Sequence, residues 1–111
     1  MANAKLANTV IKFEMMDAEV EMTLQMFALH QLRVKNRKTW SWDRYNKITQ
    51  GKGEEGEFDY AYLLYTGYLC QCVSTGCDDR YGSFEEFLRF LPSDNDAIMG
   101  AYKEMRYPKK A

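Results

Sequence analysis

The sequence predicts an α+β fold that is mainly helical, with an N-terminal β-hairpin packed against four or five short helices. Apolar and polar residues alternate near the N-terminus, and apolar residues then recur at helical spacing over the rest of the chain. The segment 58–75 is apolar on nearly every side, which is typical of a helix at the centre of its fold. The chain has 111 residues, the usual size of one domain. We therefore expect a single domain over 1–111, with loose tails at 1–8 and 107–111.

The hairpin is expected between residues 11 and 24, with a short polar joint at 16–18. Its apolar face would consist of Ile11, Phe13, Met15, Val20, Met22 and Leu24. A continuous helix from Asp17 is the alternative, because Glu, Met and Leu favour helix. The strict alternation favours two strands. A hairpin alone is unstable in water, so helices must cover its apolar face.

Two short helices should follow the hairpin. The first is amphipathic and ends in a basic stretch at 33–38; its apolar residues and histidine are Met26, Phe27, Leu29, His30, Leu32 and Val34. The second runs from about Trp40 to Thr49, with Thr39 or Ser41 as its N-cap and Gly51 as its stop. The glycine-rich segment 50–56 that follows is typical of an exposed loop.

The sequence of the second half of the chain predicts three helices. The central one covers Phe58 to Thr75 and ends at Gly76. Ser83 has a glutamate, Glu86, three residues further on, which is the spacing of a capping box. Pro92 ends that helix, and we expect Ser93 to cap the last one.

Candidate catalytic and metal-binding residues are few. The only histidine, His30, lies among apolar residues and has no evident nucleophile beside it, so we expect an ordinary half-buried histidine. Cys70 and Cys72 lie about 200° apart on the predicted helix, so the two thiols cannot face one metal ion. Asp78 and Asp79 lack the ligand pattern of an EF-hand loop. The sequence predicts no enzyme activity, no metal site and no cofactor.

The overall charge, the apolar segments and the cysteines indicate which partners and which cell compartment to expect. The net charge is −1, whereas a dedicated nucleic-acid binder normally has a clear basic excess. We find no signal peptide and no apolar run long enough to span a membrane, so we expect no membrane partner. The three cysteines cannot all pair within one chain, which fits a reducing cytoplasm.

Charges of opposite sign are concentrated in two segments. Residues 31–52 contain seven basic side chains and one acidic one, and residues 53–86 contain eight acidic side chains and one basic one. These could be two solvated faces, or a bipolar surface that docks partners or stacks copies head to tail. Trp40 and Trp42 beside the basic run offer another alternative, a small nucleic-acid-binding regulator that uses residues 33–44.

Several motifs occur in an order that is similar to a known family. After the hairpin and the helix containing Leu29, Leu32 and Arg33 come Asp43-Arg44-Tyr45-Asn46-Lys47-Ile48, Leu63-Leu64-Tyr65-Thr66-Gly67-Tyr68-Leu69-Cys70, Ser83-Phe84-Glu85-Glu86-Phe87-Leu88 and Leu91-Pro92. From about Ile11 to the C-terminus the chain resembles the tail assembly chaperones of long-tailed bacteriophages that infect Gram-positive bacteria. The Cys70–Cys72 pair and the turn at 77–79 depart from the family pattern.

The resemblance implies a protein without catalytic activity. Such chaperones coat the long, hydrophobic tape measure protein, recruit subunits of the tail tube protein, and are absent from the mature virion. The host cell cytoplasm is the implied location, with self-association as a further expectation. A minor structural component of the virion is the remaining alternative.

Protein binding needs aromatic and charged anchors rather than a reactive pocket. We expect most tyrosines of the central helix to fill the core, and one or two to reach a partner with the hydroxyl edge. The candidate binding residues are Arg37, Trp40, Trp42, Arg44, Tyr45, Tyr62, Tyr65, Tyr68 and Glu86.

Overall fold

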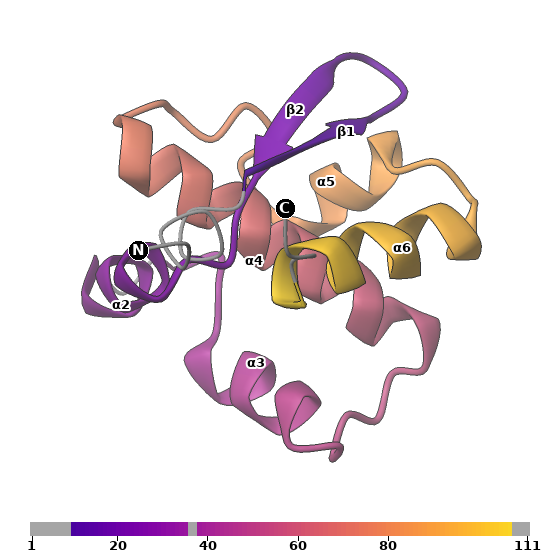
Figure 1. Cartoon of the computed structure of the whole chain (residues 1–111), viewed down its shortest axis with the longest axis horizontal. Coiled ribbons are helices and arrows are strands. Elements are labelled where there is room, and N and C mark those ends of the chain that lie inside the picture. The colour runs from indigo at the N-terminus through magenta and orange to yellow at the C-terminus, as the bar shows by residue number, and fades with distance from the viewer. Residues whose placement is uncertain (1–9, 36–37, 108–111) are drawn as a thin grey trace.

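The computed structural model describes residues 10–35 and 38–107 (Figure 1). They form strands β1 (Ile11–Glu14) and β2 (Glu19–Met22), followed by helices α2 (Met26–Lys35), α3 (Trp42–Thr49), α4 (Glu57–Thr75), α5 (Phe84–Phe90) and α6 (Asn95–Arg106). The predicted α+β class, a hairpin with five helices, is confirmed. The expected tail at 1–8 falls outside the described residues. Of the expected tail at 107–111, the structure describes Tyr107, which is exposed.

The two strands form the predicted antiparallel hairpin. Ile11 pairs with Met22 and Phe13 with Val20, and all four side chains are buried on one face. The turn between the strands is tied to the rest of the fold, because Met16 N–H donates a hydrogen bond of 2.7 Å to the carbonyl of Phe90. The alternative of a continuous helix from Asp17 is wrong.

Helix α4 passes through the middle of the molecule, and β2 and all the other described helices pack against it (Figure 1). Its residues 61–70 are all buried, as expected for a helix that is apolar on every side. At Gly67 the neighbouring elements approach closely. A Cβ atom there would lie 2.7 Å from Sδ of Met105 in α6 and 3.4 Å from Cβ of Met22 in β2.

Local capping groups set the ends of the helices. Ser41 Oγ accepts from the N–H of Arg44 at the start of α3, and Ser83 Oγ accepts from the N–H of Glu86 at the start of α5. Gly76 ends α4 in the left-handed conformation, with φ 76°. These assignments match the sequence pattern.

Two helix starts differ from expectation. Helix α3 begins at Trp42, and Trp40 precedes the cap as a buried residue of the connecting segment. The cap of α6 is Asp94, whose Oδ1 accepts from the N–H of Ala97 at 3.1 Å, so the prediction of Ser93 was wrong by one residue. Both Ser and Asp cap well, and sequence spacing alone does not choose between adjacent capping residues.

Candidate protein-binding surfaces

Five of the nine predicted binding residues lie in the core. Their side chains are at most 6% exposed: Trp40, Tyr45, Tyr62, Tyr65 and Tyr68. Trp42, Arg44 and Glu86 are partly buried, and Arg37 lies outside the described residues. The structure thus brings the aromatic residues together mainly as packing around α4.

The hydroxyl groups of three predicted tyrosines bind other parts of the same chain. Tyr62 Oη accepts from the N–H of Ser41 at 2.7 Å, and Tyr68 Oη accepts from the N–H of Arg80 at 2.7 Å. Tyr65 donates to Oδ2 of Asp79 at 3.3 Å. Burial raises the pKa of each of these tyrosines above its ordinary value. Their hydroxyls therefore hold the segments before α3 and after α4 against the central helix.

Both tryptophan rings are engaged within the chain. The indole N–H of Trp40 donates to Oγ1 of Thr66 at 2.8 Å. The centre of the Trp40 ring lies 6.3 Å from the centre of the Trp42 ring. The guanidinium carbon of Arg33 lies 4.5 Å from the centre of the Trp42 ring, and that of Arg44 lies 4.3 Å from the centre of the Tyr62 ring. These are cation–π distances, so the two arginines secure aromatic packing within the chain.

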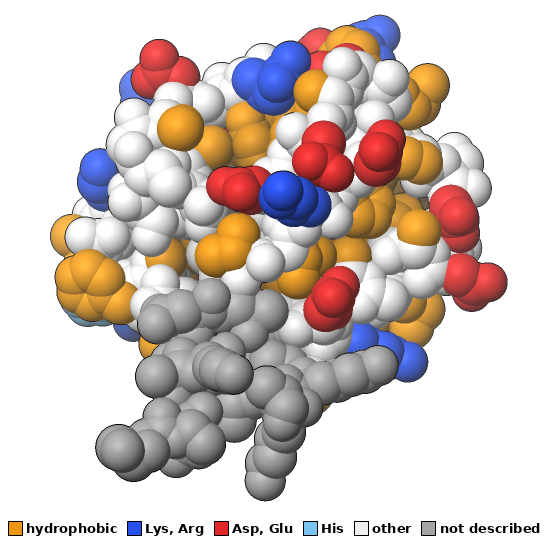
Figure 2. Space-filling model, turned by 45° about the horizontal axis from the view of Figure 1, so that its top comes forward, with side chains coloured by type: hydrophobic (Ala, Val, Ile, Leu, Met, Phe, Trp, Pro, Cys, Tyr) orange, Lys and Arg blue, Asp and Glu red, His pale blue; other side chains and the backbone are white. Residues whose placement is uncertain are grey.

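One side of α2 is apolar and exposed, which the sequence pattern of this helix does not indicate. Met26, Phe27 and Val34 are 75%, 65% and 67% exposed, whereas Ala28, Leu29 and Leu32 are buried on the opposite side of the helix. His30 is exposed as well, so the expectation of a half-buried histidine was wrong. Figure 2 shows hydrophobic side chains exposed at the edge of the molecule that α2 occupies.

The exposed apolar residues of α2 form one stripe. At 100° per residue, Met26, Phe27, His30 and Val34 fall within an arc of about 100°, centred opposite the buried residues. The charged side chains beside it are basic: Arg33 and Lys35 in the last turn of α2. We call Met26, Phe27, His30 and Val34 the outer face of α2.

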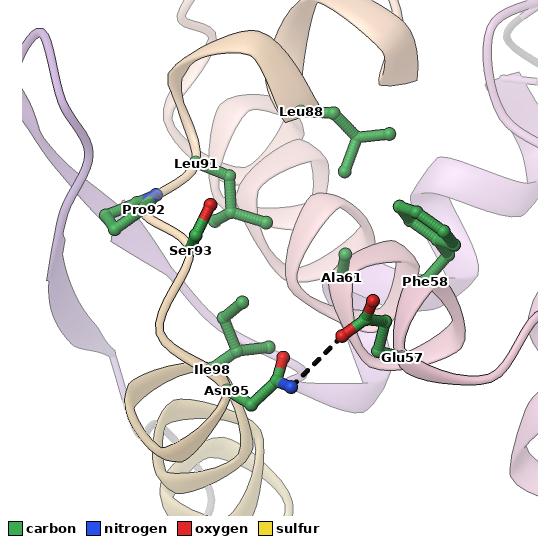
Figure 3. Close-up of a pocket in the computed structure, with 9 residues that line it drawn as sticks. All are labelled: Glu57, Phe58, Ala61, Leu88, Leu91, Pro92, Ser93, Asn95 and Ile98. Atoms are coloured by element: carbon green, nitrogen blue, oxygen red, sulfur yellow. Dashed lines mark hydrogen bonds between the residues drawn. The ribbon is translucent and has the colours of Figure 1, made fainter.

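A cavity lies on the other side of the molecule, between the start of α4, the end of α5 and the start of α6 (Figure 3). Its volume is about 230 Å³, and its lining includes Phe58, Ala61, Leu88, Leu91 and Ile98. Glu57 Oε2 accepts a hydrogen bond of 3.0 Å from Nδ2 of Asn95 at its edge.

The cysteines do not form a cluster of ligands. Cys70 and Cys72 are buried and Cys77 is exposed. Burial raises the pKa of Cys70 to about 12, so this thiol is protonated at neutral pH. Among residues 10–35 and 38–107, no group of three or more His, Cys, Asp or Glu side chains is placed to hold a metal ion. Within the same ranges, no helix combines the length and the apolar character that crossing a membrane requires.

Comparison with known proteins finds no match to a family model, to a curated protein or to a solved structure.

Proposed function

We propose that this chain is a tail assembly chaperone of a long-tailed bacteriophage. It binds the tape measure protein in the host cytoplasm, recruits tail tube subunits, and leaves before the virion is complete. The order of the sequence motifs from about Ile11 to the C-terminus supports this proposal. The observation that carries it is the outer face of α2.

That outer face is costly for an isolated domain to expose. Full burial of a large apolar side chain contributes about 1.5–3 kcal/mol, and Met26, Phe27 and Val34 are each at least 65% exposed. Concentrated on one helix face, such residues are typical of a surface that a partner covers. A chaperone for a long hydrophobic protein needs a surface of this kind.

The shape of the outer face suits a helical partner. Met26, His30 and Val34 follow one another at intervals of four residues, and Phe27 lies seven residues before Val34. This is the spacing at which one helix packs along another. Since the charged neighbours, Arg33 and Lys35, are basic, a helix with acidic residues beside its apolar stripe fits best.

Co-expression with the tape measure protein tests this proposal. We expect the tape measure protein to be soluble and to co-purify with the wild-type chain, and to precipitate with the double variant Phe27→Gln/Val34→Gln. The matched control is Met16→Gln, which changes an apolar residue of 70% exposure at the hairpin turn. This control should retain binding.

Two results would contradict the proposal. One is a tape measure protein that is equally soluble without this chain and never co-purifies with it. The other is the presence of this chain in purified virions, which would assign it to the structural components of the particle.

A further inference from the structure

The cavity at the junction of α4, α5 and α6 has walls of apolar side chains and one polar edge. In Figure 3, Phe58 and Ala61 of α4, Leu88 and Leu91 from α5 and its end, and Ile98 of α6 surround the hollow. Glu57 and Asn95 lie together at one edge, joined by their hydrogen bond. This combination of an apolar interior and a few polar groups at the rim is typical of a binding pocket.

The local sequence explains why the cavity forms. Helix α5 ends at Phe90 because Pro92 cannot continue it, and the chain turns through 91–94 before Asp94 caps α6. The first turn of α4 lies across this turn, where Phe58 forms a wall and remains 48% exposed. Three element ends meet here, and no side chain of residues 10–35 or 38–107 fills the space between them.

The volume limits what the cavity can hold. At about 230 Å³ it is smaller than the roughly 300–1,000 Å³ of most small-molecule sites. It is large enough for one leucine, methionine or phenylalanine side chain. An apolar anchor residue of another protein fits it better than a cofactor.

The charge around the cavity indicates what flanks that side chain. Glu57 is the charged lining residue, the exposed Asp94 and Asp96 adjoin the lining residues Ser93 and Asn95, and none of the lining residues is basic. The N-termini of α4 and α6 also meet here, each with about half a positive charge. The three carboxylates outweigh them, so the rim attracts a cation.

We propose that this cavity binds one apolar side chain of a partner protein whose adjacent residue is Lys or Arg, with that cation paired to Glu57. The site is independent of the chaperone assignment. It also differs from the outer face of α2, which lies on the other side of α4 (Figure 1) and has basic neighbours. The two surfaces therefore select partner segments of opposite charge.

Nuclear magnetic resonance of the ¹⁵N-labelled full chain tests this site with two short peptides. The probe is acetyl-Lys-Phe-Lys-amide, and acetyl-Glu-Phe-Glu-amide is the control of opposite charge. We expect the first to shift the amide signals of residues 57–61 and 88–98 saturably, with a Kd on the order of 1–10 mM. The second should bind roughly two- to fivefold more weakly.

Two matched variants identify the role of Glu57. Glu57→Gln removes the charge at the rim, and Glu54→Gln removes a charge from the neighbouring loop that does not line the cavity. Glu57→Gln should weaken binding of the lysine peptide about twofold and reduce its preference over the glutamate peptide, because only Asp94 and Asp96 then remain at the rim. Glu54→Gln should leave the affinities of both peptides unchanged. The amide spectrum of each free variant reports whether it is folded.

The proposal is wrong if the lysine peptide shifts signals elsewhere or none at all. It is also wrong if the folded Glu57→Gln variant keeps the full charge preference of the wild-type chain, or if Glu54→Gln reduces that preference equally. None of these results depends on tape measure binding, so failure here leaves the chaperone proposal intact.

Discussion

Buried polar side chains attach the segment before α3 to the central helix. Thr66 Oγ1 accepts from the indole N–H of Trp40 at 2.8 Å and donates to the carbonyl of Tyr62 at 2.8 Å. One turn earlier on α4, the hydroxyl of Tyr62 accepts from the N–H of Ser41. Adjacent residues of the segment are thus fixed to two neighbouring turns of α4.

The bond between Trp40 and Thr66 gives a first prediction. Trp40→Phe removes a buried donor and part of a buried ring, so the free energy of unfolding should fall by about 2–4 kcal/mol. Urea denaturation measures this change. Trp42→Phe is the matched control; its ring is only partly buried, and we expect a loss below about 1 kcal/mol. Equal losses in the two variants would contradict this account.

The hairpin turn gives a second prediction. Tyr81 donates to Oδ1 of Asp17 at 2.9 Å, and Arg80 lies 3.5 Å from Oδ2 of the same residue. Tyr81→Phe keeps the ring packing against Phe87 and removes the hydrogen bond, which should lower the free energy of unfolding by about 1–2 kcal/mol. Hydrogen exchange should accelerate most for amides near the turn. Unchanged exchange there would show that Asp17 does not hold the hairpin.

At the scale of whole elements, the crossing of α4 with α6 and β2 depends on a residue without a side chain. Gly67→Val would place methyl groups against Met105 and Met22, and such overpacking costs about 1–3 kcal/mol. Gly100 in α6 has no atom within 4 Å of its Cβ position, so Gly100→Val should change stability by less than about 0.5 kcal/mol. Thermal unfolding of the two variants compares them directly. A Gly67→Val protein as stable as the control would mean that the helices can separate without cost.

The buried and the exposed side of helix α2 should respond differently to substitution. Leu32 is fully buried, so Leu32→Ala should lower the free energy of unfolding by about 2–5 kcal/mol. Phe27→Gln on the outer face should change it by less than about 0.5 kcal/mol. Chemical denaturation distinguishes the two cases. A large loss for Phe27→Gln would show that this face stabilises the isolated domain.

Most elements could be predicted from the sequence because their signals are local. Alternation with a period of two marks the hairpin, Ser41 and Ser83 mark helix starts, and Gly76 marks a helix end. The orientation of α2 could not be predicted in this way. Apolar residues occur on both sides of this ten-residue helix, and only its packing against α4 decides which side is buried.

The candidate site was harder to predict for a related reason. The hydroxyls of the tyrosines in α4 form hydrogen bonds with residues 12 to 21 positions away in the sequence, such as Arg80 and Ser41. Spacing along the sequence carries no information on such partners. The exposed stripe on α2 had a signal, an apolar residue at nearly every position of a short helix, but that signal alone does not separate core from surface.

The whole molecule should respond to alkaline pH through its buried tyrosines. Burial raises the pKa of Tyr45 to about 12, and raises the pKa values of Tyr65, Tyr68 and Tyr81 well above the ordinary value of 10. Since the folded state favours the protonated form, this stabilisation is complete below about pH 10 and is lost as the pH rises through the folded values.

We therefore expect the fold to remain stable to about pH 10 and to unfold cooperatively above it. Tyrosinate absorbance and circular dichroism, recorded together, measure the two events. The ionisation of these four tyrosines should coincide with the loss of helix. Full ionisation while the helix content remains native would contradict the burial of their hydroxyls.

The central position of α4 also has a consequence for synthesis on the ribosome. The hairpin and α2 are translated before α4, yet their apolar sides pack against it. Between the completion of Met22 and that of Thr75 lie roughly 3–10 s of translation at about 5–20 residues per second. During that interval the nascent chain presents uncovered apolar residues beside the ribosome. The chain that we propose keeps another protein from aggregating therefore depends, during its own synthesis, on the rapid translation of α4.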